Sequence, residues 1–337
     1  MKIKKSVFCF GFAFFVSGFL FCSCSQSCLL AEKNQSEKLN SVKILNWNLQ
    51  TFFDGNFSGT EYSEFASSSA GWCKEKYGVR LERLSEVVKA CEPDIFVMQE
   101  LENEDQLYDI FNRLCSNFSV SKNYSYGCFY KDEGSAIGLG VLSRFPLFGK
   151  TVHSLDVRSE AESQPSMRPL LKVFVNVNER PLLLLVNHWK SKSGGAEKSE
   201  VWRNFQESVL AQSFAEYEGK NIPVVACGDF NRDILEFRKI NGRKLQFNVE
   251  LRGENPALVY SPWYDSGGNL FEPGSYFYNG KWERIDHFFA GSGANVSDFK
   301  VECKGNWSNA DGSPSKYILK YGTGYSDHFP VSCVISW

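Results

Sequence analysis

The sequence lacks the features that would place it in several simple classes. Its net charge is only −2 over 337 residues and 15% of the residues are aromatic, whereas disordered chains combine few aromatics with high net charge. Gly (27) and Pro (11) are present in ordinary numbers, which excludes a collagen-like or low-complexity chain. The absence of a basic excess excludes a nucleic-acid binder that relies on bulk positive charge. We therefore expect a globular protein, with a length that allows one large domain or two smaller ones.

The first thirty residues resemble an export signal. Three lysines lie among the first five residues, and the Phe-rich run Ser6–Cys22 carries no charge. That run is shorter than the roughly 20 residues of a membrane-spanning helix, and its basic flank is typical of a secretory signal. The small Ser23 before Cys24 resembles a bacterial lipobox, which implies cleavage there and a lipid on Cys24. An uncleaved anchor or a plain signal peptide is the alternative.

These features predict a signal peptide over 1–23, a polar tether over 24–41 and one domain over 42–337. Removing 1–23 takes away three lysines and no acid, so the remaining chain has 34 basic and 39 acidic side chains and a net charge of −5. We expect an exported protein, lipid-anchored to a bacterial membrane or cell surface, with secretion as the alternative. No protein partner is inferred, and we expect a monomer.

The cysteines do not indicate a zinc site, because no CxxC or Cys/His spacing of the zinc-binding kind occurs. Of the 11 cysteines, eight remain if the signal is removed and Cys24 carries lipid. An even number in an exported protein permits disulfides but does not identify the pairs.

Hydrophobic patterns predict strands and helices that follow one another without a second linker. Helical periodicity is present over 79–91, 105–115 and 196–217. Strands are predicted over 42–48, 94–100, 137–143, 170–177, 182–187, 222–226, 285–290 and 330–336. Many strands with few helices predict two sheets packed face to face with helices outside.

Polar side chains stand at or beside the ends of these apolar runs, where a rigid scaffold often presents catalytic groups. The residues are Asn48, Glu100, His188, Asp229, Asn231, Asp286, Asp327 and His328. Each alone is more often a turn, cap or core residue. Together they favour a chemistry: carboxylate and amide oxygens suit a hard cation such as Mg²⁺, and two histidines suit acid–base work on a phosphate ester.

Six motifs carry a family resemblance. ILNWN, MQE, NHWKSK, GDFN, RIDHFF and SDHFP occur in the order expected of the endonuclease/exonuclease/phosphatase superfamily, and the chain resembles it from about Val42 to Trp337. The resemblance implies a four-layer α/β sandwich, with two mixed β-sheets between helices, and metal-dependent phosphoester hydrolysis. Mg²⁺ is the implied metal, with Mn²⁺ or Ca²⁺ as alternatives.

The resemblance also implies roles for the residues in these motifs. Asn48 and Glu100 resemble the metal-site pair, with Asp327 a second carboxylate on the metal side. Asp229 and Asn231 resemble the groups that position the attacking water and the phosphate. His328 resembles a general base or phosphate-polarising imidazole, and Asp286 resembles the carboxylate that orients it. His188 is expected to act on the phosphate or leaving group, and Arg168 and Lys190 to contact the phosphate.

Two departures from the family pattern bear on the function. Gln50 stands where apurinic-endonuclease-like members carry an acid, which counts against a base-excision repair role. The Tyr-x-Glu of deoxyribonuclease I-like members is not clear, since Tyr126-Gly127-Cys128 lacks the acid and Glu133 is distant. The acid partner of His188 is therefore open.

The NHWKSK segment, followed by a glycine pair and a long helix, resembles extracellular bacterial nucleases. We therefore predict a nuclease acting on DNA or RNA, with Lys190 and Lys192 either supplying positive charge or lying in a solvated loop. A sphingomyelinase-like phospholipid headgroup phosphodiesterase, with aromatics over 263–282 as a membrane-touching rim, is the alternative. A phosphatase for soluble sugar or inositol phosphates ranks third, and a non-catalytic surface-binding lipoprotein is disfavoured because none of the metal or histidine positions is substituted.

Overall fold

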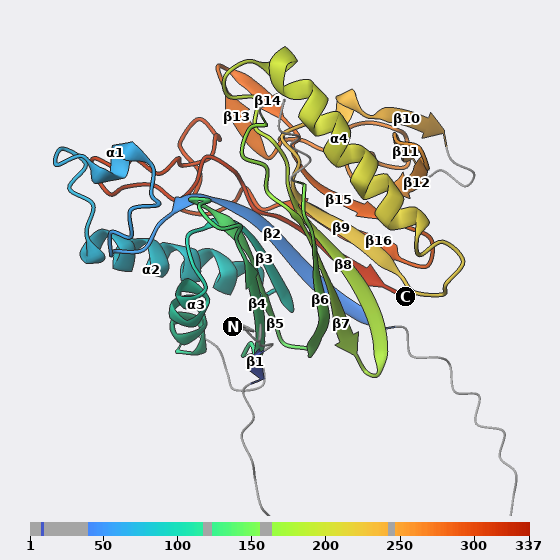
Figure 1. The fold of residues 1–337 in the computed structure, drawn as a ribbon, viewed down its shortest axis with the longest axis horizontal. Helices are drawn as coiled ribbons and strands as arrows, with labels where there is room; N and C mark the ends of the chain where they lie inside the picture. The colour runs from blue at the N-terminus through green and yellow to red at the C-terminus, as the bar shows by residue number, and fades with distance from the viewer. Residues whose placement is uncertain (1–7, 10–39, 117–122, 156–163, 242–246) are drawn as a thin grey trace, which may run out of the picture.

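The protein is described by a computed structural model that covers residues 8–9, 40–116, 123–155, 164–241 and 247–337 (Figure 1). Two β-sheets pack face to face, and helices cover their outer faces. The predicted four-layer α/β sandwich is confirmed. Apart from Phe8 and Cys9, the predicted signal peptide lies outside the described residues, as do Cys24 and the tether up to residue 39.

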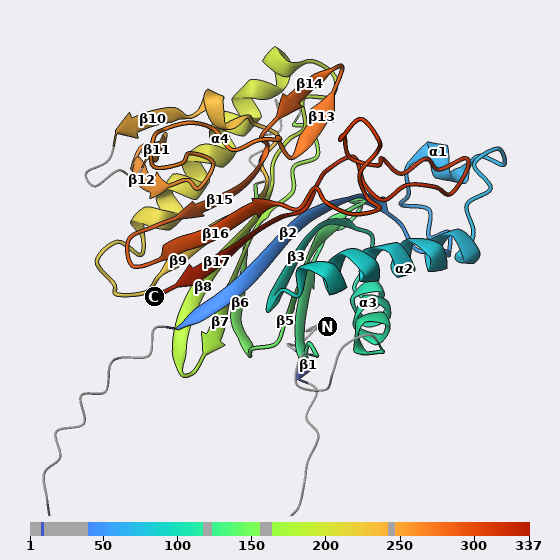
Figure 2. The same cartoon turned by 180° about the vertical axis from the view of Figure 1, so that it is seen from behind.

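The first sheet has seven strands and is mixed. Its order is β1 (Phe8–Cys9), β4 (Tyr126–Tyr130), β5 (Gly138–Ser143), β3 (Ile95–Leu101), β2 (Ser41–Phe52), β17 (Val331–Ser336) and β16 (Asn295–Val301). Strands β2 and β3 are parallel, and the other pairs are antiparallel. Helices α2 (Lys74–Cys91) and α3 (Asp105–Cys115) cover its outer face, and the short α1 (Ser63–Ala66) lies beyond α2 (Figure 2).

The second sheet has eight strands. Its order is β10 (Arg238–Asn241), β11 (Phe247–Leu251), β12 (Ala257–Tyr260), β15 (Asp286–Ala290), β9 (Val224–Asp229), β8 (Arg180–His188), β7 (Leu170–Val177) and β6 (Leu147–His153). Helix α4 (Ala196–Ala215) runs across its outer face. A separate hairpin, β13 (Tyr276–Tyr278) and β14 (Lys281–Glu283), lies near the first turns of α4, and a 3₁₀ turn, Ile234–Glu236, follows β9.

Strand β2 shows how the sequence pattern divides the layers. Ile44 belongs to the core between the sheets, whereas Leu45, Trp47 and Leu49 belong to the core under α2 and α3. Because side chains alternate across a strand, Asn48 faces the second sheet and not the helices. The hydrophobic pattern of this strand therefore directs Asn48 toward the interface of the two sheets.

Helix α2 ends where its sequence signals stop it. Leu81, Leu84 and Val88 recur at helical spacing and are buried under the first sheet. Glu92 adopts a left-handed conformation and its N–H caps the carbonyl of Val88, and Pro93 follows. Helix α2 begins at Lys74, five residues before the predicted start at position 79.

The predicted strands and helices are present, with ends shifted by a few residues. The sequence analysis missed β4, β6, β16 and the strands between Arg238 and Glu283, most of which are short or have a solvent-facing side that weakens the pattern. The seven cysteines from Cys73 to Cys333 are free, so no disulfide is formed among them. No helix in the described ranges is long and apolar enough to cross a membrane.

Candidate active site

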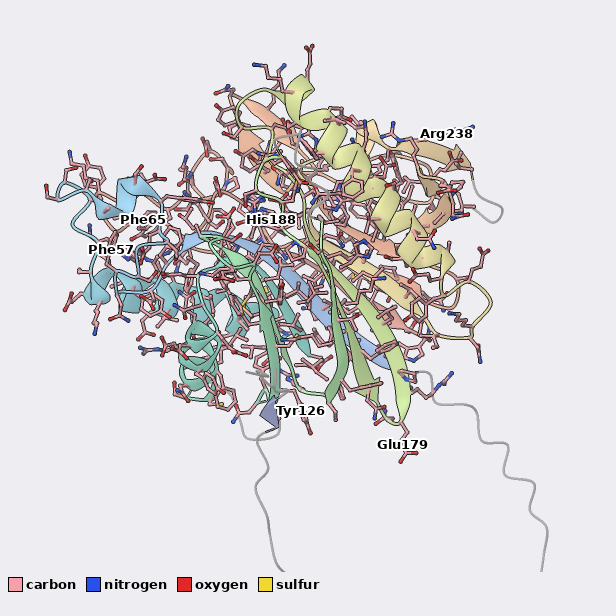
Figure 3. The ribbon with its side chains drawn as sticks, in the orientation of Figure 1. Phe57, Phe65, Tyr126, Glu179, His188 and Arg238 are labelled. Atoms are coloured by element: carbon pink, nitrogen blue, oxygen red, sulfur yellow. The ribbon has the colours of Figure 1, made fainter. Side chains whose placement is uncertain are left out.

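Three neighbouring strands of the second sheet place polar residues side by side. His188, at the end of β8, pairs in register with Asp229 at the end of β9. Asp229 pairs in turn with Asp286, the first residue of the antiparallel strand β15. Figure 3 shows His188 near the middle of the molecule, with Glu179 in the turn at the other end of the β7–β8 hairpin. The register of three strands therefore builds one wall of the site.

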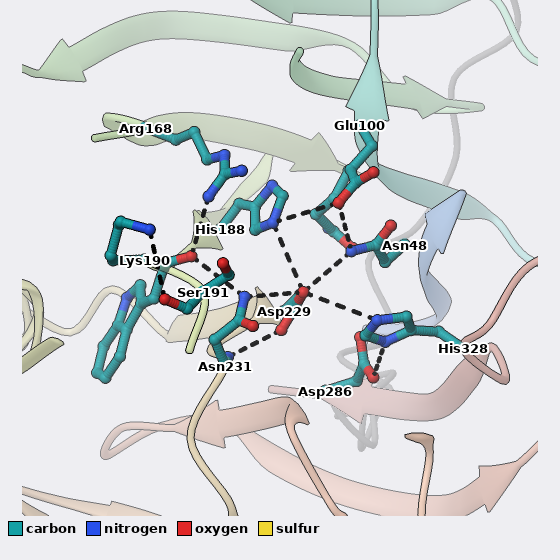
Figure 4. Close-up of polar contacts among 12 residues, drawn as sticks. Asn48, Glu100, Arg168, His188, Lys190, Ser191, Asp229, Asn231, Asp286 and His328 are labelled. Carbon is teal, nitrogen blue, oxygen red and sulfur yellow. Dashed lines mark hydrogen bonds and ion pairs between the residues drawn. The ribbon is translucent and has the colours of Figure 1, made fainter. Parts of the chain in front are cut away.

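The first sheet contributes Asn48 and Glu100 from its parallel pair β2 and β3. Both strands are irregular at this point: the pairing register shifts between Asn48 and Phe52 and again between Gln99 and Leu101. Glu100 occupies a left-handed conformation with φ 69°, which is uncommon for a residue with a side chain. The irregularity brings Glu100 next to Asn48, whose Nδ2 donates to Glu100 Oε1 at 3.2 Å (Figure 4).

Asp229 lies at the centre of the polar contacts. Its Oδ2 accepts hydrogen bonds from Asn48 Nδ2 at 2.9 Å and Asn231 Nδ2 at 3.1 Å, and its Oδ1 accepts from the Asn231 backbone N–H at 2.8 Å. Burial and then the charge of Asp286 raise the pKa of Asp229 to about 7, although His328 and the hydrogen bonds act in the opposite direction. The carboxyl group is thus buried and oriented by two amides, and its pKa lies near neutral pH.

His328 is held between carboxylates. Its Nδ1 lies 2.8 Å from Asp286 Oδ2, and its Nε2 lies 4.0 Å from Asp229 Oδ2. Burial alone would lower the pKa of His328, but Asp286, followed by Asp229 and Asp327, raises it to about 10. The structure therefore brings together the predicted pair of His328 and its orienting carboxylate, and favours the imidazolium form.

His188 differs from His328 in its surroundings. Its Nε2 lies 3.7 Å from Glu100 Oε1 and 3.6 Å from Asp229 Oδ2, distances longer than a hydrogen bond. Burial, followed by Arg168 and His328, lowers its pKa well below the usual range, which favours the neutral ring. Its buried Nδ1 has no hydrogen-bond partner among the described residues. The described residues therefore provide no carboxylate hydrogen-bonded to His188 Nδ1, so its acid partner stays open.

These groups line a cleft of about 740 Å³ between the ends of the two sheets. Arg168 lines this cleft, and its Nη1 donates to the Trp189 carbonyl at 3.2 Å. Lys190 is not one of the lining residues, and its Nζ lies 3.4 Å from the Ser191 carbonyl. Lys192 does line the cleft but is paired with Glu236 at 2.7 Å, and more distantly with Glu283. Of the three predicted cations, Arg168 is thus the best placed to meet an anion.

Two tyrosines form an aromatic strip on the β13 hairpin. Tyr276 and Tyr278 both line the cleft, and their rings are nearly parallel, 17° apart with centroids at 6.2 Å. The ring of Tyr276 also lies 4.7 Å from that of His328. Tyr278 is 58% exposed, so the strip runs from His328 to the rim of the cleft.

The donor set fits a hard divalent cation. Burial and the nearby negative charge of Glu100 both raise the pKa of Asp327. A cation between the two carboxylates would relieve the repulsion between them. The side-chain amide of Asn48 lies beside Glu100, with its nitrogen donating to that carboxylate and its oxygen accepting from the Gln50 N–H. Among the described residues, no group of three or more His, Cys, Asp or Glu has the arrangement of an all-side-chain metal site. Mg²⁺ sites commonly use only one or two carboxylates with water and substrate phosphate, so Glu100, Asn48 and Asp327 remain suitable ligands.

All of the predicted site residues except Lys190 and Asp286 line the cleft, and Asp286 reaches it through His328. The sequence analysis did not single out Thr51, Tyr62 or Glu64, which also line it. Tyr62 and Glu64 come from the loop around α1, which no motif marks. Tyr62 lies against Arg168, whose charge partly offsets the burial that raises the pKa of Tyr62. Only the tertiary fold brings this loop to the site.

Comparisons with solved structures show the same fold at low identity. The chain is similar to truncated Caenorhabditis elegans TDP2, with a TM-score of 0.54 and 14% identity over 88% of this chain and 97% of that one. An endonuclease/exonuclease/phosphatase family protein from Bacteroides thetaiotaomicron gives 0.54 and 16% over 89% and 99%. A mannosyl-6-phosphatase from the same bacterium gives 0.52 and 17% over 88% and 100%.

Among curated protein sequences, none matches this chain. The sequence does match the Endonuclease/Exonuclease/phosphatase family over residues 45–328, a range that includes every motif residue to which a site role was assigned. The family match, the two-sheet fold and the clustered motif residues agree with one another. The chain therefore belongs to the Endonuclease/Exonuclease/phosphatase family of phosphoester hydrolases.

Proposed function

We propose that the protein is an exported Mg²⁺-dependent phosphodiesterase that cleaves DNA or RNA by attack of water on phosphorus. The observation that carries this proposal is the arrangement around Asp229. One buried carboxylate faces two histidines, at 3.6 Å and 4.0 Å, with the proposed metal ligand Asn48 on its other side. Water attack on a phosphodiester needs a proton acceptor, a stabiliser of negative charge and a donor near the leaving oxygen, and these groups provide them.

Asp229 is the group that holds and deprotonates the water. Asn231 donates hydrogen bonds to both Oδ1 and Oδ2, and these bonds fix the orientation of the carboxylate toward the cleft. His328 is unsuited to be the base, because the Asp286 carboxylate 2.8 Å from its Nδ1 stabilises the protonated ring. It instead stabilises the charge that develops on the phosphate oxygens, together with Arg168.

His188 and the metal ligands complete the site. His188 sits between Glu100 and Asp229 and lines the same cleft as Arg168, and we assign it to the leaving oxygen. A divalent cation held by Glu100, Asn48 and Asp327 would supply Lewis-acid polarisation of the phosphate. Arg168 and His328, which line the same cleft, would bind the phosphate oxygens.

The aromatic strip favours a substrate that carries flat rings. Tyr276 and Tyr278 offer ring faces from His328 to the rim, and bases stack on such faces whatever their identity. The other aromatics over 263–282 give mixed support to the membrane-touching rim of the phospholipid alternative. Trp263 is fully buried and Trp282 packs between Phe277 and Phe329, whereas Phe271 is 39% exposed. The phospholipid alternative therefore keeps only part of the rim on which it was based.

A sugar phosphate is the second candidate substrate. Tyrosine faces also pack against sugar rings, and the similar structure from Bacteroides thetaiotaomicron is a mannosyl-6-phosphatase. At 17% identity that similarity concerns the fold, so the substrate of the present protein has to be tested directly.

The test is to offer the purified protein, with Mg²⁺, Mn²⁺ or Ca²⁺, four substrates in parallel: plasmid DNA, RNA, sphingomyelin and mannose 6-phosphate. We expect cleavage of DNA or RNA, abolished in the variants Glu100→Ala and His328→Ala. The matched controls are Glu218→Ala and His153→Ala, which change exposed residues of the same kinds away from the cleft. Hydrolysis of mannose 6-phosphate or sphingomyelin with the plasmid left intact would reject the nuclease proposal.

We also propose that the protein is exported and lipid-anchored through Cys24. The charge-free Phe-rich run and the small residue before Cys24 support this proposal. Metabolic labelling with a radioactive fatty acid should mark the protein and not its Cys24→Ser variant. Equal labelling of the two would reject the anchor.

A further inference from the structure

The chain after Asn48 makes a left-handed bend whose backbone N–H groups point at both proposed metal ligands. Gln50 and Thr51 have φ of 51° and 44°. The Gln50 N–H donates to Asn48 Oδ1 at 2.9 Å, and the Thr51 N–H donates to Glu100 Oε2 at 2.5 Å. Two successive left-handed residues, one of them β-branched, are unfavourable in an L-chain, so neighbouring groups have to hold the bend.

Arg80 of α2 is the group that holds it. Its Nη1 donates to the Thr51 carbonyl at 2.8 Å, and its Nη2 donates to the carbonyls of Leu49 and Gln50 at 2.6 and 2.7 Å. One planar guanidinium thus binds three successive carbonyls of the bend, which a lysine ammonium on a flexible stem would hold with less defined geometry. The side chain is almost fully buried and forms no ion pair with a carboxylate of the described residues.

A second contact closes the bend from the side of the loop that precedes β17. The side-chain amide of Gln50 pairs with the backbone of Tyr317: Nε2 donates to the carbonyl at 3.1 Å, and Oε1 accepts from the N–H at 2.8 Å. The Tyr317 ring lies 4.0 Å from the Arg80 guanidinium carbon, a cation–π contact. Gln50 is the residue that departs from the acid of apurinic-endonuclease-like members, and here its amide serves a main-chain contact.

We propose that Arg80 is a positioning residue for the metal site, acting through the bend at Gln50 and Thr51, with Gln50 and Tyr317 locking the bend from the other side. The guanidinium fixes the bend, the bend fixes the Thr51 N–H, and that N–H orients the Glu100 carboxylate. This inference rests on the proposed metal site and is independent of the proposed substrate. Groups that orient metal ligands from outside commonly change metal affinity by 10- to 100-fold when altered.

The test compares two arginines of the same helix. Arg83 lies one turn from Arg80, also donates to backbone carbonyls, of Gly322 and Gly324, and also has an aromatic ring over its guanidinium. It does not contact the bend. Mn²⁺ binding is measured by electron paramagnetic resonance on the full chain and on its Arg80→Lys and Arg83→Lys variants, together with the melting temperature of each without metal.

We expect the dissociation constant for Mn²⁺ to rise about tenfold or more in Arg80→Lys and to stay within about twofold of the parent in Arg83→Lys. Both variants keep the positive charge, so a change in overall electrostatics does not explain the difference. An equal Mn²⁺ affinity for parent and Arg80→Lys, with similar losses of melting temperature in the two variants, would assign Arg80 a purely structural role and overturn the inference.

If Arg80→Lys does not fold, Gln50→Met replaces it, because this change removes the pairing with Tyr317 while keeping a side chain of similar length. A parental affinity in Gln50→Met would then overturn the inference. Absence of Mn²⁺ binding by the parent chain would reject the proposed metal site as well, whereas normal binding without nuclease activity would reject only the proposed substrate.

Discussion

The contact between His328 and Asp286 allows the proposed mechanism to be tested with a single change. In Asp286→Asn the side chain keeps its shape but loses the negative charge that faces His328 Nδ1 at 2.8 Å. Both residues are buried, so water cannot take over the contact. A hydrogen bond to a charged group contributes about 2 kcal/mol more than no contact, and each 1.4 kcal/mol corresponds to a factor of ten in rate.

We therefore expect kcat of Asp286→Asn to fall about 30-fold, with a much smaller change in KM, if the imidazolium acts mainly in the transition state. The assay is steady-state cleavage of whichever nucleic acid the parent hydrolyses, at saturating Mg²⁺. Asp298→Asn, which changes an exposed aspartate of β16, is the matched control and should equal the parent. A kcat within threefold of the parent would refute the role assigned to the Asp286 carboxylate.

Three other predictions follow from the structure. Gly228→Ala should destabilise the fold by about 4 kcal/mol or more, because a Cβ on Gly228, whose φ is 147°, would lie 2.0 Å from the Asn187 carbonyl oxygen. The melting temperature should fall strongly, and a value close to that of the parent would contradict this. Burial lowers the pKa of His287 to about 4, so between pH 6.5 and pH 4 the unfolded chain binds a proton on this ring that the folded chain does not. The parent should therefore lose about 3 kcal/mol of folding stability over that range, and His287→Gln should not show this loss. Chemical denaturation at pH 7 and pH 4 measures the loss, and equal losses in both proteins would disprove the prediction. Tyr278→Ala should raise KM for a nucleic-acid substrate about tenfold, as the loss of one stacked base predicts, whereas Tyr278→Phe and a change of the exposed Tyr321 to Ala should not; a normal KM in Tyr278→Ala would remove the stacking role.

Much of the fold could be predicted from local sequence. The periods of 3.6 and 2 in the hydrophobic pattern predicted α2, α3, α4 and the central strands to within a few residues, because those elements are buried and their patterns are strong. The strands missed, such as β6 with its exposed outer positions, are held by their neighbours more than by their own pattern. A strand of that kind is determined by pairing, which a linear pattern does not contain.

The site could be predicted in part. Strand ends with polar residues, read together with the family resemblance, indicated His188, Asp229, Asp286 and His328, and the structure brings these four together. The sequence analysis assigned Lys190 to the phosphate as well. In the structure Lys190 does not line the cleft and its Nζ lies 3.4 Å from the Ser191 carbonyl, which nothing in NHWKSK indicates. Its neighbour Lys192 reaches the cleft and is neutralised by glutamates more than forty positions away in the chain.

By itself, then, the sequence determined the layers of the fold, the strand ends at which the chemistry stands and the family. It could do so because hydrophobic periodicity and residue type act locally. Only the tertiary structure decided which charges are free and how the ligands are aimed. Arg80 reaches back some thirty positions to three carbonyls, and Tyr317 lies more than two hundred positions from the bend that it closes. The orientation of Glu100 depends on that convergence, since its left-handed backbone is stable only where distant parts of the chain surround it.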